Sequence, residues 1–269
     1  MKIIPITTGY TLVSSAVVNR ETHRFSFAYT GLFQSRKKRI CIPVKCFYVE
    51  INSHKFLVDA GWSKECKTNA LKHLGFGLFF ASEPVMKDEE SAIYQLNEMG
   101  IKEESLDGIY MTHLDCDHVS GVHDFNNIPI YSSQDEIDYS KENKLRYGKM
   151  TKGLSLFPLT FNDDEEAPFG RSLDVFHDKS VIAYLTPTHS KGSIIYKICD
   201  NRSFALIVGD NGYNQDSWDK GYLPGPLYNK GNTREILKWI KKQSLRDDCL
   251  GVFCAHDPLS LKGVDNKNS

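Results

Sequence analysis

The sequence has no excess of charge of one sign and no apolar run long enough to cross a membrane. Its 33 Lys and Arg residues are balanced by 34 Asp and Glu residues, so it lacks the positive field that a phosphate backbone attracts. The apolar runs, such as 204–208, have the length of a strand, whereas a spanning helix needs about 20 apolar residues. We therefore expect neither nucleic acid nor a membrane among its partners.

Paired cysteine motifs are also missing. The seven cysteines are odd in number and widely spaced, which is typical of reduced thiols in a reducing compartment. At the N-terminus, Pro5, Thr7 and Gly9 interrupt the apolar stretch that a secretory signal needs. These features predict a cytoplasmic protein.

The composition is that of an ordinary globular protein, with 41% hydrophobic and 25% charged residues. No internal repeat or low-complexity linker divides the chain, so we expect a single domain over residues 1–269. Hydrophobic patterns predict strands at 44–51, 56–60, 108–112, 128–131, 181–185, 193–198, 204–208 and 249–254, and helices at 87–99 and 233–242. Because helices are interspersed between groups of strands, the pattern favours a layered α+β domain over a regular βαβ repeat.

Four residues that can bind metal ions are crowded together directly after the predicted strand 108–112. They are His113, Asp115, Asp117 and His118. Imidazole and carboxylate groups bind divalent cations through nitrogen and oxygen, and a short loop can direct them to one point. A solvated polar loop is the alternative, because short motifs also match by chance.

Three further candidate ligands follow the ends of later strands. His189 comes after the strand 181–185 and a proline turn, Asp210 ends the strand 204–208, and His256 follows the last strand. Strand ends on one rim of a sheet assembly can converge on a single site. This repeated position favours a metal centre over a polar loop.

The order of these motifs resembles the metallo-β-lactamase superfamily from about residue 44 to residue 257. The features that carry the resemblance are Asp59-x-Gly61, the motif at 113–118, Thr186-Pro187-x-His189, Gly209-Asp210 and His256. The resemblance implies a four-layer αββα sandwich. Within the superfamily the spacing is most similar to the lactonases that include N-acyl-homoserine lactonases and pyridoxolactonase, which place a substrate-contacting tyrosine at the position of Tyr213.

The resemblance also implies a centre of two metal ions, with three residues on each ion and one residue bridging both. The first ion would be held by His113, Asp115 and His189, and the second by Asp117, His118 and His256. Asp210 would bridge the two ions. In the superfamily, the position of Asp59 supports the site from behind the ligands without binding metal.

Residue 115 departs from the commoner motif, which has histidine there. A carboxylate adds negative charge and hardness, which favours manganese or iron over zinc. Flavodiiron members of the superfamily also carry an acidic residue here, but they continue into a flavin-binding domain, whereas this chain stops at Ser269. We therefore expect two divalent ions, either zinc or manganese or iron, in a hydrolase rather than in a redox protein. The alternative is that the first site is weak and only the second is well occupied.

Two divalent ions that share a hydroxide can attack an ester and polarise its carbonyl oxygen. The predicted function is hydrolysis of a small lactone or related carboxylic ester, in which Tyr213 stabilises the oxyanion and Asp117 helps to move a proton to the leaving alkoxide. A thioesterase or phosphodiesterase of the same fold would share every ligand. A non-catalytic binding protein would be expected to lose ligands. Both a monomer and a homodimer are compatible with the sequence.

Several aromatic segments are candidates for the wall of a substrate pocket. They are Trp62, the run 76–80 and the segment 218–228, although we expect at least half of Phe76, Phe79 and Phe80 to be core residues. The segment 22–39 is a candidate cover for the pocket, a subunit contact or a surface loop. Cys116 is expected to be a buried spacer, and five histidines are expected to be non-ligands: His23, His54, His73, His123 and His177.

Overall fold

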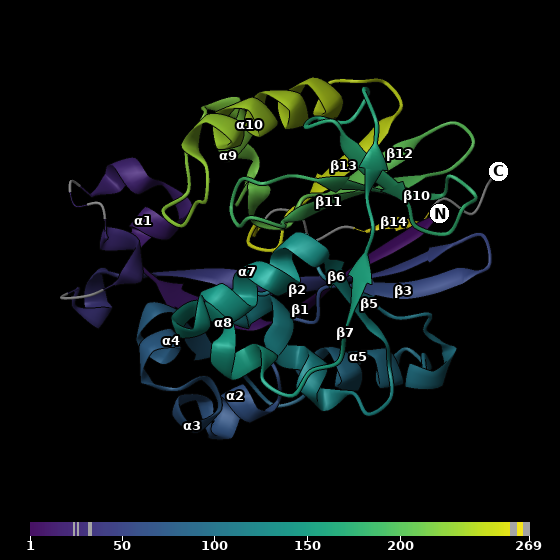
Figure 1. Cartoon of the computed structure of the whole chain (residues 1–269). Coiled ribbons are helices and arrows are strands. Elements are labelled where there is room, and N and C mark those ends of the chain that lie inside the picture. Colours follow the sequence, from purple (N-terminus) through teal and green to yellow (C-terminus); the bar gives the residue numbers. More distant parts are fainter. Residues whose placement is uncertain (24, 26, 32–33, 259–262, 266–269) are drawn as a thin grey trace.

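Two β-sheets face each other in the middle of the molecule, and helices cover the outer face of each sheet (Figure 1). The computed structural model describes residues 1–23, 25, 27–31, 34–258 and 263–265. The four layers run helices, sheet, sheet, helices, which confirms the predicted αββα sandwich of the α+β class.

The first sheet combines an antiparallel half with a parallel half. Its strands lie in the order β14-β1-β2-β3-β5-β6-β7, and β4 pairs with β1. Their bounds are β1 (Lys2–Val13), β2 (Ile40–Ile51), β3 (His54–Val58), β4 (Glu83–Val85), β5 (Ile109–Tyr110), β6 (Ile130–Ser133), β7 (Leu156–Leu159) and β14 (Val264–Asp265). The hairpin predicted around residues 52–55 is present, with Phe47 opposite Val58. The parallel pairs β3–β5 and β5–β6 then bring the metal motif to one end of this sheet.

The second sheet has the order β13-β12-β11-β10-β9-β8 and is antiparallel except for the parallel pair β12–β13. Its strands are β8 (Asn162–Asp163), β9 (Arg171–Asp174), β10 (Val181–Leu185), β11 (Ile194–Cys199), β12 (Phe204–Ile207) and β13 (Cys249–Phe253). The predicted strands in this half of the chain are all confirmed to within about two residues, and β10 has the predicted bounds.

Ten α-helices lie among the described residues. They are α1 (Ser15–Val18), α2 (Glu65–Thr68), α3 (Ala70–Leu74), α4 (Phe76–Ala81), α5 (Ala92–Glu98), α6 (Cys116–Val119), α7 (Gln134–Glu142), α8 (Lys144–Thr151), α9 (Gln215–Asp219) and α10 (Lys230–Ser244). Short 3-10 helices span Arg20–Thr22, Ala28–Thr30, Arg36–Lys38, Glu103–Ser105, Ser120–Asp124 and Gly209–Asn211.

The two predicted helices are both present, but their ends differ from the prediction. The helix expected from residue 87 begins only at Ala92, because residues 87–90 form a turn in which the Lys87 backbone N–H donates to the Glu90 carboxylate. The helix α10 is longer than predicted, because the Asn229 side chain caps its N-terminus by accepting from the Asn232 N–H. None of the described helices has the length and apolar composition needed to cross a bilayer.

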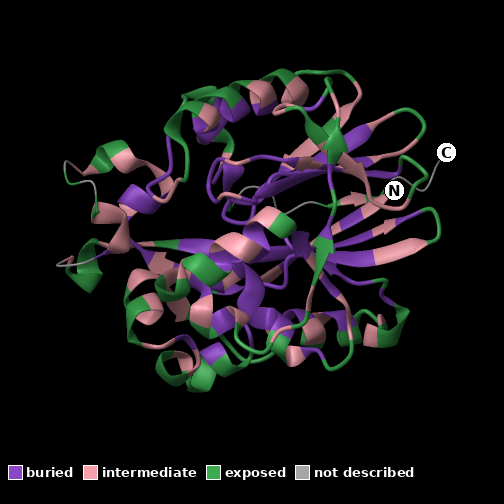
Figure 2. Ribbon diagram, in the orientation of Figure 1, coloured by how far each residue is buried: buried purple, intermediate pink, exposed green. Residues whose placement is uncertain are grey.

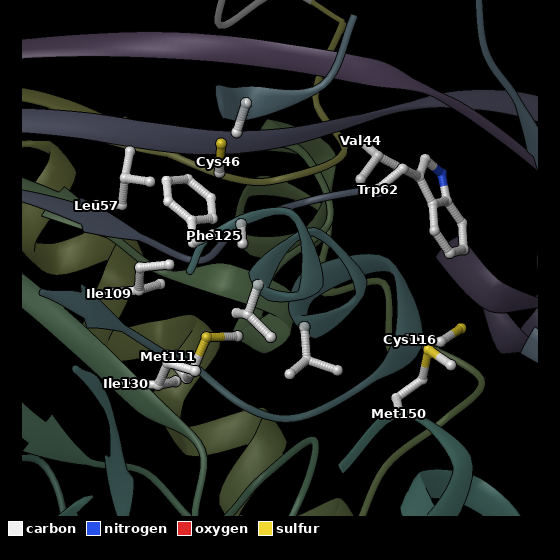
Figure 3. Packing of buried hydrophobic residues seen from close by; sticks show 14 of the residues in the cluster. Val44, Cys46, Leu57, Trp62, Ile109, Met111, Cys116, Phe125, Ile130 and Met150 are labelled. Atoms are coloured by element: carbon white, nitrogen blue, oxygen red, sulfur yellow. The ribbon is translucent and has the colours of Figure 1, made fainter. Parts of the chain in front are cut away.

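Apolar side chains make up the buried core between the layers. In Figure 2 the strands in the middle of the molecule are coloured mainly as buried. Between the sheets, Phe47 and Val58 of the first sheet belong to the same buried cluster as Ala183 and Tyr196 of the second. A second cluster lies beneath the first sheet and is drawn in Figure 3. It includes Cys116, which is 5% exposed, so the expectation of a buried residue between two candidate ligands is met.

A close backbone contact at Gly121 fixes the end of the metal motif against the loop after β3. The Gly121 N–H donates to the Gly61 carbonyl at 2.7 Å, and the Ala60 N–H donates to the His118 carbonyl at 2.9 Å. A Cβ atom on residue 121 would lie 2.2 Å from the Ala60 carbonyl oxygen, which is part of the rigid backbone. The two loops therefore pack closely only with glycine at this position.

Substitution of Gly121 by alanine should destabilise the protein because the two backbones must move apart. We expect the Gly121→Ala variant to lose about 1–3 kcal/mol of unfolding free energy, the usual cost of overpacking, as measured by chemical denaturation. Gly77→Ala is the control, since nothing lies within 4 Å of a Cβ at that position. Equal stability of Gly121→Ala and wild type would show that this contact does not constrain the loops.

Candidate metal centre

All seven predicted metal ligands meet at one end of the two sheets. They lie on loops or short helices that follow β5, β10, β12 and β13. Their donor atoms form three overlapping groups, each with atoms within 4.8 Å of one another: His113, Asp115 and His189; His113, His118 and Asp210; and Asp117, His118 and His256. The structure thus brings together residues that are as far apart in the chain as His113 and His256.

Asp210 lies at the centre of one half of this site. Its Oδ1 atom is 3.2 Å from Nε2 of His118 and 3.2 Å from Nε2 of His256, and the latter atom is 3.5 Å from Oδ2 of Asp117. The side chains of both histidines and of Asp210 are at most 3% exposed. This half therefore combines two carboxylates and two imidazoles in a buried position.

Three donor atoms at and next to this half have no hydrogen-bond partner. They are Nε2 of His113, Nε2 of His118 and Oδ1 of Asp210, all buried and all in one of the three groups. Buried polar atoms are nearly always paired, so unpaired ones require an explanation. Imidazole nitrogen and carboxylate oxygen are the donors that divalent metal ions accept, and these residues fit such an ion.

Hydrogen bonds behind the histidines direct their Nε2 atoms toward this point. Nδ1 of His118 donates to Oδ2 of Asp59 at 2.8 Å, and Nδ1 of His256 donates to the Pro43 carbonyl at 2.8 Å. A proton on Nδ1 leaves the lone pair on Nε2, which is the usual arrangement of a metal-binding histidine. Asp59 is itself held by Thr112, whose N–H and hydroxyl donate to its two oxygens at 2.7 and 2.8 Å.

The other half of the site contains a positively charged residue that the sequence analysis missed. Arg146 of α8 donates from Nε to Oδ1 of Asp115 and from Nη2 to Oδ2, both at 2.6 Å. Nη2 also lies 2.9 Å from Nε2 of His189, which is in turn 2.9 Å from Oδ2 of Asp115. The sequence motif gives no signal for Arg146, because only the folding of α8 against the motif brings it there.

A second missed residue, Glu136 of α7, joins the two loops that carry the ligands of this half. Its side chain is fully buried and accepts from the Leu114 N–H and the Gly192 N–H, both at 3.1 Å. Leu114 belongs to the motif loop, and Gly192 follows His189 by three positions. Glu136 therefore positions Asp115 and His189 relative to each other.

Charge in the site shifts several pKa values. Burial opposes ionisation of Asp115, but the Arg146 guanidinium together with the hydrogen bonds of His113 and His189 outweighs it, so the pKa of that carboxyl is well below its usual value. Burial lowers the pKa of His118, but the carboxylates of Asp210 and Asp59 outweigh it and raise that pKa well above the ordinary histidine value. The carboxylates around His118 thus favour a positive charge at this point, which a proton or a metal ion can supply.

A cavity of about 360 Å³ opens onto the candidate ligands. Its floor includes Asp117, Asp210 and His256, and its wall includes Ile42 and Leu78. Tyr213 also lines it, is 3% exposed, and stacks on the His256 ring with centroids 5.0 Å apart. Burial and the Asp210 carboxylate, which accepts a hydrogen bond from the hydroxyl, raise the pKa of Tyr213, so the hydroxyl stays protonated as a donor.

The aromatic segments have mixed positions relative to the cavity. Leu78 and Leu227 line it, whereas Trp62 is fully buried and donates from its indole nitrogen to the Tyr10 carbonyl. The expectation that at least half of three phenylalanines are core was wrong. Phe79 packs against the core, but Phe76 and Phe80 are 72% and 49% exposed, because the short helix α4 lies at the surface.

The N-terminal segment 22–39 contributes to the cavity through Tyr29 and Thr30, which favours the first of its three alternatives, a cover for the pocket. Phe25 and Phe27 of the same segment are exposed, and Phe33 lies outside the described residues. Within the part of the chain that the structure describes, no metal-binding group includes any of the five histidines expected to be non-ligands.

The αββα layers and the buried cluster of histidines and carboxylates at one end of the sheets define a metal-binding protein of a known architecture. The model of the metallo-beta-lactamase superfamily matches residues 39–256, and the chain belongs to this superfamily. The family resemblance inferred from the motifs is thus confirmed.

Relatives in sequence include lactonases. The chain is 23% identical over 225 residues to the N-acyl homoserine lactonase AttM of Azorhizobium caulinodans, covering 81% of this chain and 82% of that protein. It is 24% identical over 225 residues to an N-acyl homoserine lactonase of Bacillus cereus, covering 82% and 84% of the two chains.

Solved structures show the same fold. One is an N-acyl homoserine lactone hydrolase with the product N-hexanoyl-L-homoserine bound at its metal centre, with a TM-score of 0.74, 20% identity, and coverage of 96% of this chain and 93% of that one. Another is AidC, a dizinc quorum-quenching lactonase, with a TM-score of 0.62, 15% identity, and coverage of 96% and 88%.

Proposed function

We propose that this protein is a metal-dependent hydrolase that opens a lactone or cleaves a related small carboxylic ester. The observation that carries the proposal is the buried group of unpaired donor atoms from His113, His118 and Asp210, of which Asp210 lines an open cavity. The names of the sequence relatives and the bound product in the solved neighbour support the substrate class.

Metal binding is assigned to the half of the site around Asp210. Asp117, His118 and His256 would hold the ion together with Asp210, and zinc, manganese and iron all accept such nitrogen and oxygen donors. A divalent ion bound there supplies a Lewis acid and lowers the pKa of a coordinated water. His113, Asp115 and His189 are the remaining residues of the two-ion set that the family resemblance implies.

Two side chains of the cavity are assigned to the reaction itself. The Tyr213 hydroxyl is fixed by its ring stacking on His256 and would donate a hydrogen bond to the carbonyl oxygen as negative charge develops there. The Asp117 carboxylate faces the cavity and would carry the proton of the attacking water to the leaving alkoxide. The ester C–O bond breaks, and the products are a carboxylate and an alcohol.

The cavity favours a carboxylic ester over a phosphodiester. A phosphodiester would be expected to meet uncommitted cationic side chains. Neither Lys191 nor Lys220 lines the cavity, and Lys220 is exposed and bound to Asp216. Arg146, which does line it, is already paired with Asp115. The apolar side chains of Ile42, Leu78 and Leu227 suit an acyl chain.

A panel of substrates tests the proposal. Protein loaded separately with zinc, manganese and iron is offered lactones, simple esters, a thioester and a phosphodiester, and proton release is followed with Asp210→Ala as the blank. We expect ring opening of lactones that depends on Asp210. Turnover of the phosphodiester or thioester without turnover of any lactone or ester would overturn the substrate class.

The Tyr213→Phe variant tests the oxyanion assignment. It removes only the hydroxyl, so we expect kcat for lactone opening to fall by about 100-fold, as when one donor to a developing oxyanion is lost. Metal content should not change, because the assigned ligands remain. An unchanged kcat would exclude Tyr213 from the reaction.

We also propose a cellular location and a domain organisation, based on the sequence and on the cysteines. We place the protein in the cytoplasm, since all seven cysteines are free, including the exposed Cys41, which suits a reducing compartment. We also treat residues 1–269 as a single domain, with the site formed jointly by loops of both sheets.

A further inference from the structure

Arg146 sits where the family resemblance implies the first metal ion. That ion would be held by His113, Asp115 and His189, whose donor atoms lie within 4.8 Å of one another. The Arg146 guanidinium is within 2.6 Å of both Asp115 oxygens and 2.9 Å of Nε2 of His189. It thus binds two of the three residues assigned to this ion, through both Asp115 oxygens and Nε2 of His189.

Two of the three residues of this group, Asp115 and His189, have these donor atoms engaged within the protein. The Asp115 carboxylate receives two parallel bonds from Arg146, the strongest arrangement for this pair. Nε2 of His189 either accepts from Arg146 or donates to Asp115, and in both cases no lone pair remains for a metal. Nε2 of the third residue, His113, is unpaired, but His113 also forms a group with His118 and Asp210, so it can serve the Asp210 side.

The partners of the Nδ1 atoms give independent evidence that the two halves differ in metal binding. His118 and His256 each have a partner on Nδ1 that fixes the proton there and leaves Nε2 for a metal. Nδ1 of His189 is buried and has no partner. His189 therefore lacks the supporting hydrogen bond that the histidines of the other half possess.

The charges of the two halves also differ. Asp115 and Arg146 neutralise each other's charge. Asp117 and Asp210 both lie next to His256, and among the described residues no arginine or lysine forms an ion pair with either carboxylate. A divalent ion neutralises the second half, but next to Asp115 it would meet the guanidinium, which repels it. The charge of the site is therefore balanced by Arg146 in the Asp115 half and by one divalent ion in the Asp210 half.

We propose that the Arg146 guanidinium takes the place of the first ion, so that the site holds one divalent ion, on the Asp210 side, and a fixed organic cation on the Asp115 side. This inference rests on the proposed function only for the existence of the metal site. It replaces the expected two-ion centre with a centre of one metal and one arginine.

Metal content tests the inference without reference to activity. Wild-type protein, Arg146→Met and the control Lys149→Met, from the same helix, are loaded with excess zinc, freed of unbound ions by gel filtration, and analysed by mass spectrometry of the metal. We expect one ion per chain in the wild type and in Lys149→Met. Arg146→Met should bind a second ion, because Asp115 and His189 become available.

The manganese form gives a second measurement that needs no variant. Its electron paramagnetic resonance spectrum should be that of an isolated ion rather than that of a coupled pair. Two ions in the wild type, a coupled spectrum, or a single ion in folded Arg146→Met would each overturn the inference. One bound ion without turnover of any lactone or ester would contradict the proposed function and leave the inference standing.

Discussion

Replacement of Asp210 by alanine is expected to remove the bound metal and to lower lactone hydrolysis by on the order of 10³-fold, the upper range for loss of a single electrostatic group. Oδ1 of Asp210 is 3.2 Å from Nε2 of both His118 and His256, so it is the atom on which the two histidines converge. Without it, Asp117 is the sole carboxylate left in this half of the site.

The measurement for Asp210→Ala combines turnover with metal content, and circular dichroism establishes that the variant is folded. Asp216→Ala is the matched control, because Asp216 is a half-exposed aspartate just beyond the site whose carboxylate pairs with Lys220. The control should retain both metal and activity. If Asp210→Ala kept its metal and full turnover, the assignment of Asp210 would be wrong.

The Asp59→Asn variant should lose about 10- to 100-fold in metal affinity, the usual cost of removing a partner behind a ligand. An amide at this position presents an N–H either to Nδ1 of His118 or to the N–H of Thr112. In the first orientation the proton of His118 must move to Nε2, where it blocks metal binding. In the second orientation the amide N–H of residue 59 points at the N–H of Thr112, so two donors repel each other. Both weaken the site without changing its shape.

Asparagine tolerates the left-handed backbone of residue 59, where φ is 59°, so the variant should fold. Competition with a chromophoric zinc chelator measures the affinity, with Asp216→Asn as the control for loss of a carboxylate elsewhere. An affinity equal to that of the wild type would show that Asp59 does not fix the tautomer of His118.

The sequence was sufficient to predict the sandwich and the clustering of the seven candidate ligands. Strands such as β10 have a clear alternation, with Val181, Ala183 and Leu185 buried between the sheets. The ligands follow strand ends, and strand ends on one rim converge. Local pattern and family motif therefore agree on the region that forms the site.

The helices α7 and α8 could not be predicted in the same way. Their apolar residues are few, and Tyr147 and Met150 become buried only when α8 packs against the metal motif. Tertiary contacts rather than local periodicity stabilise such helices. The roles of Glu136 and Arg146 depend on this packing, so no motif in the sequence indicated that a buried arginine lies beside Asp115.

The most direct test of the account is a titration of metal-free protein with zinc and with manganese while the opening of one acyl-homoserine lactone is followed. We predict no turnover in the presence of chelator. Activity should rise in proportion to bound metal and reach its plateau at one ion per chain. Lactone opening that persists in the metal-free protein, or its absence when the site is fully loaded, would contradict a metal-dependent lactonase.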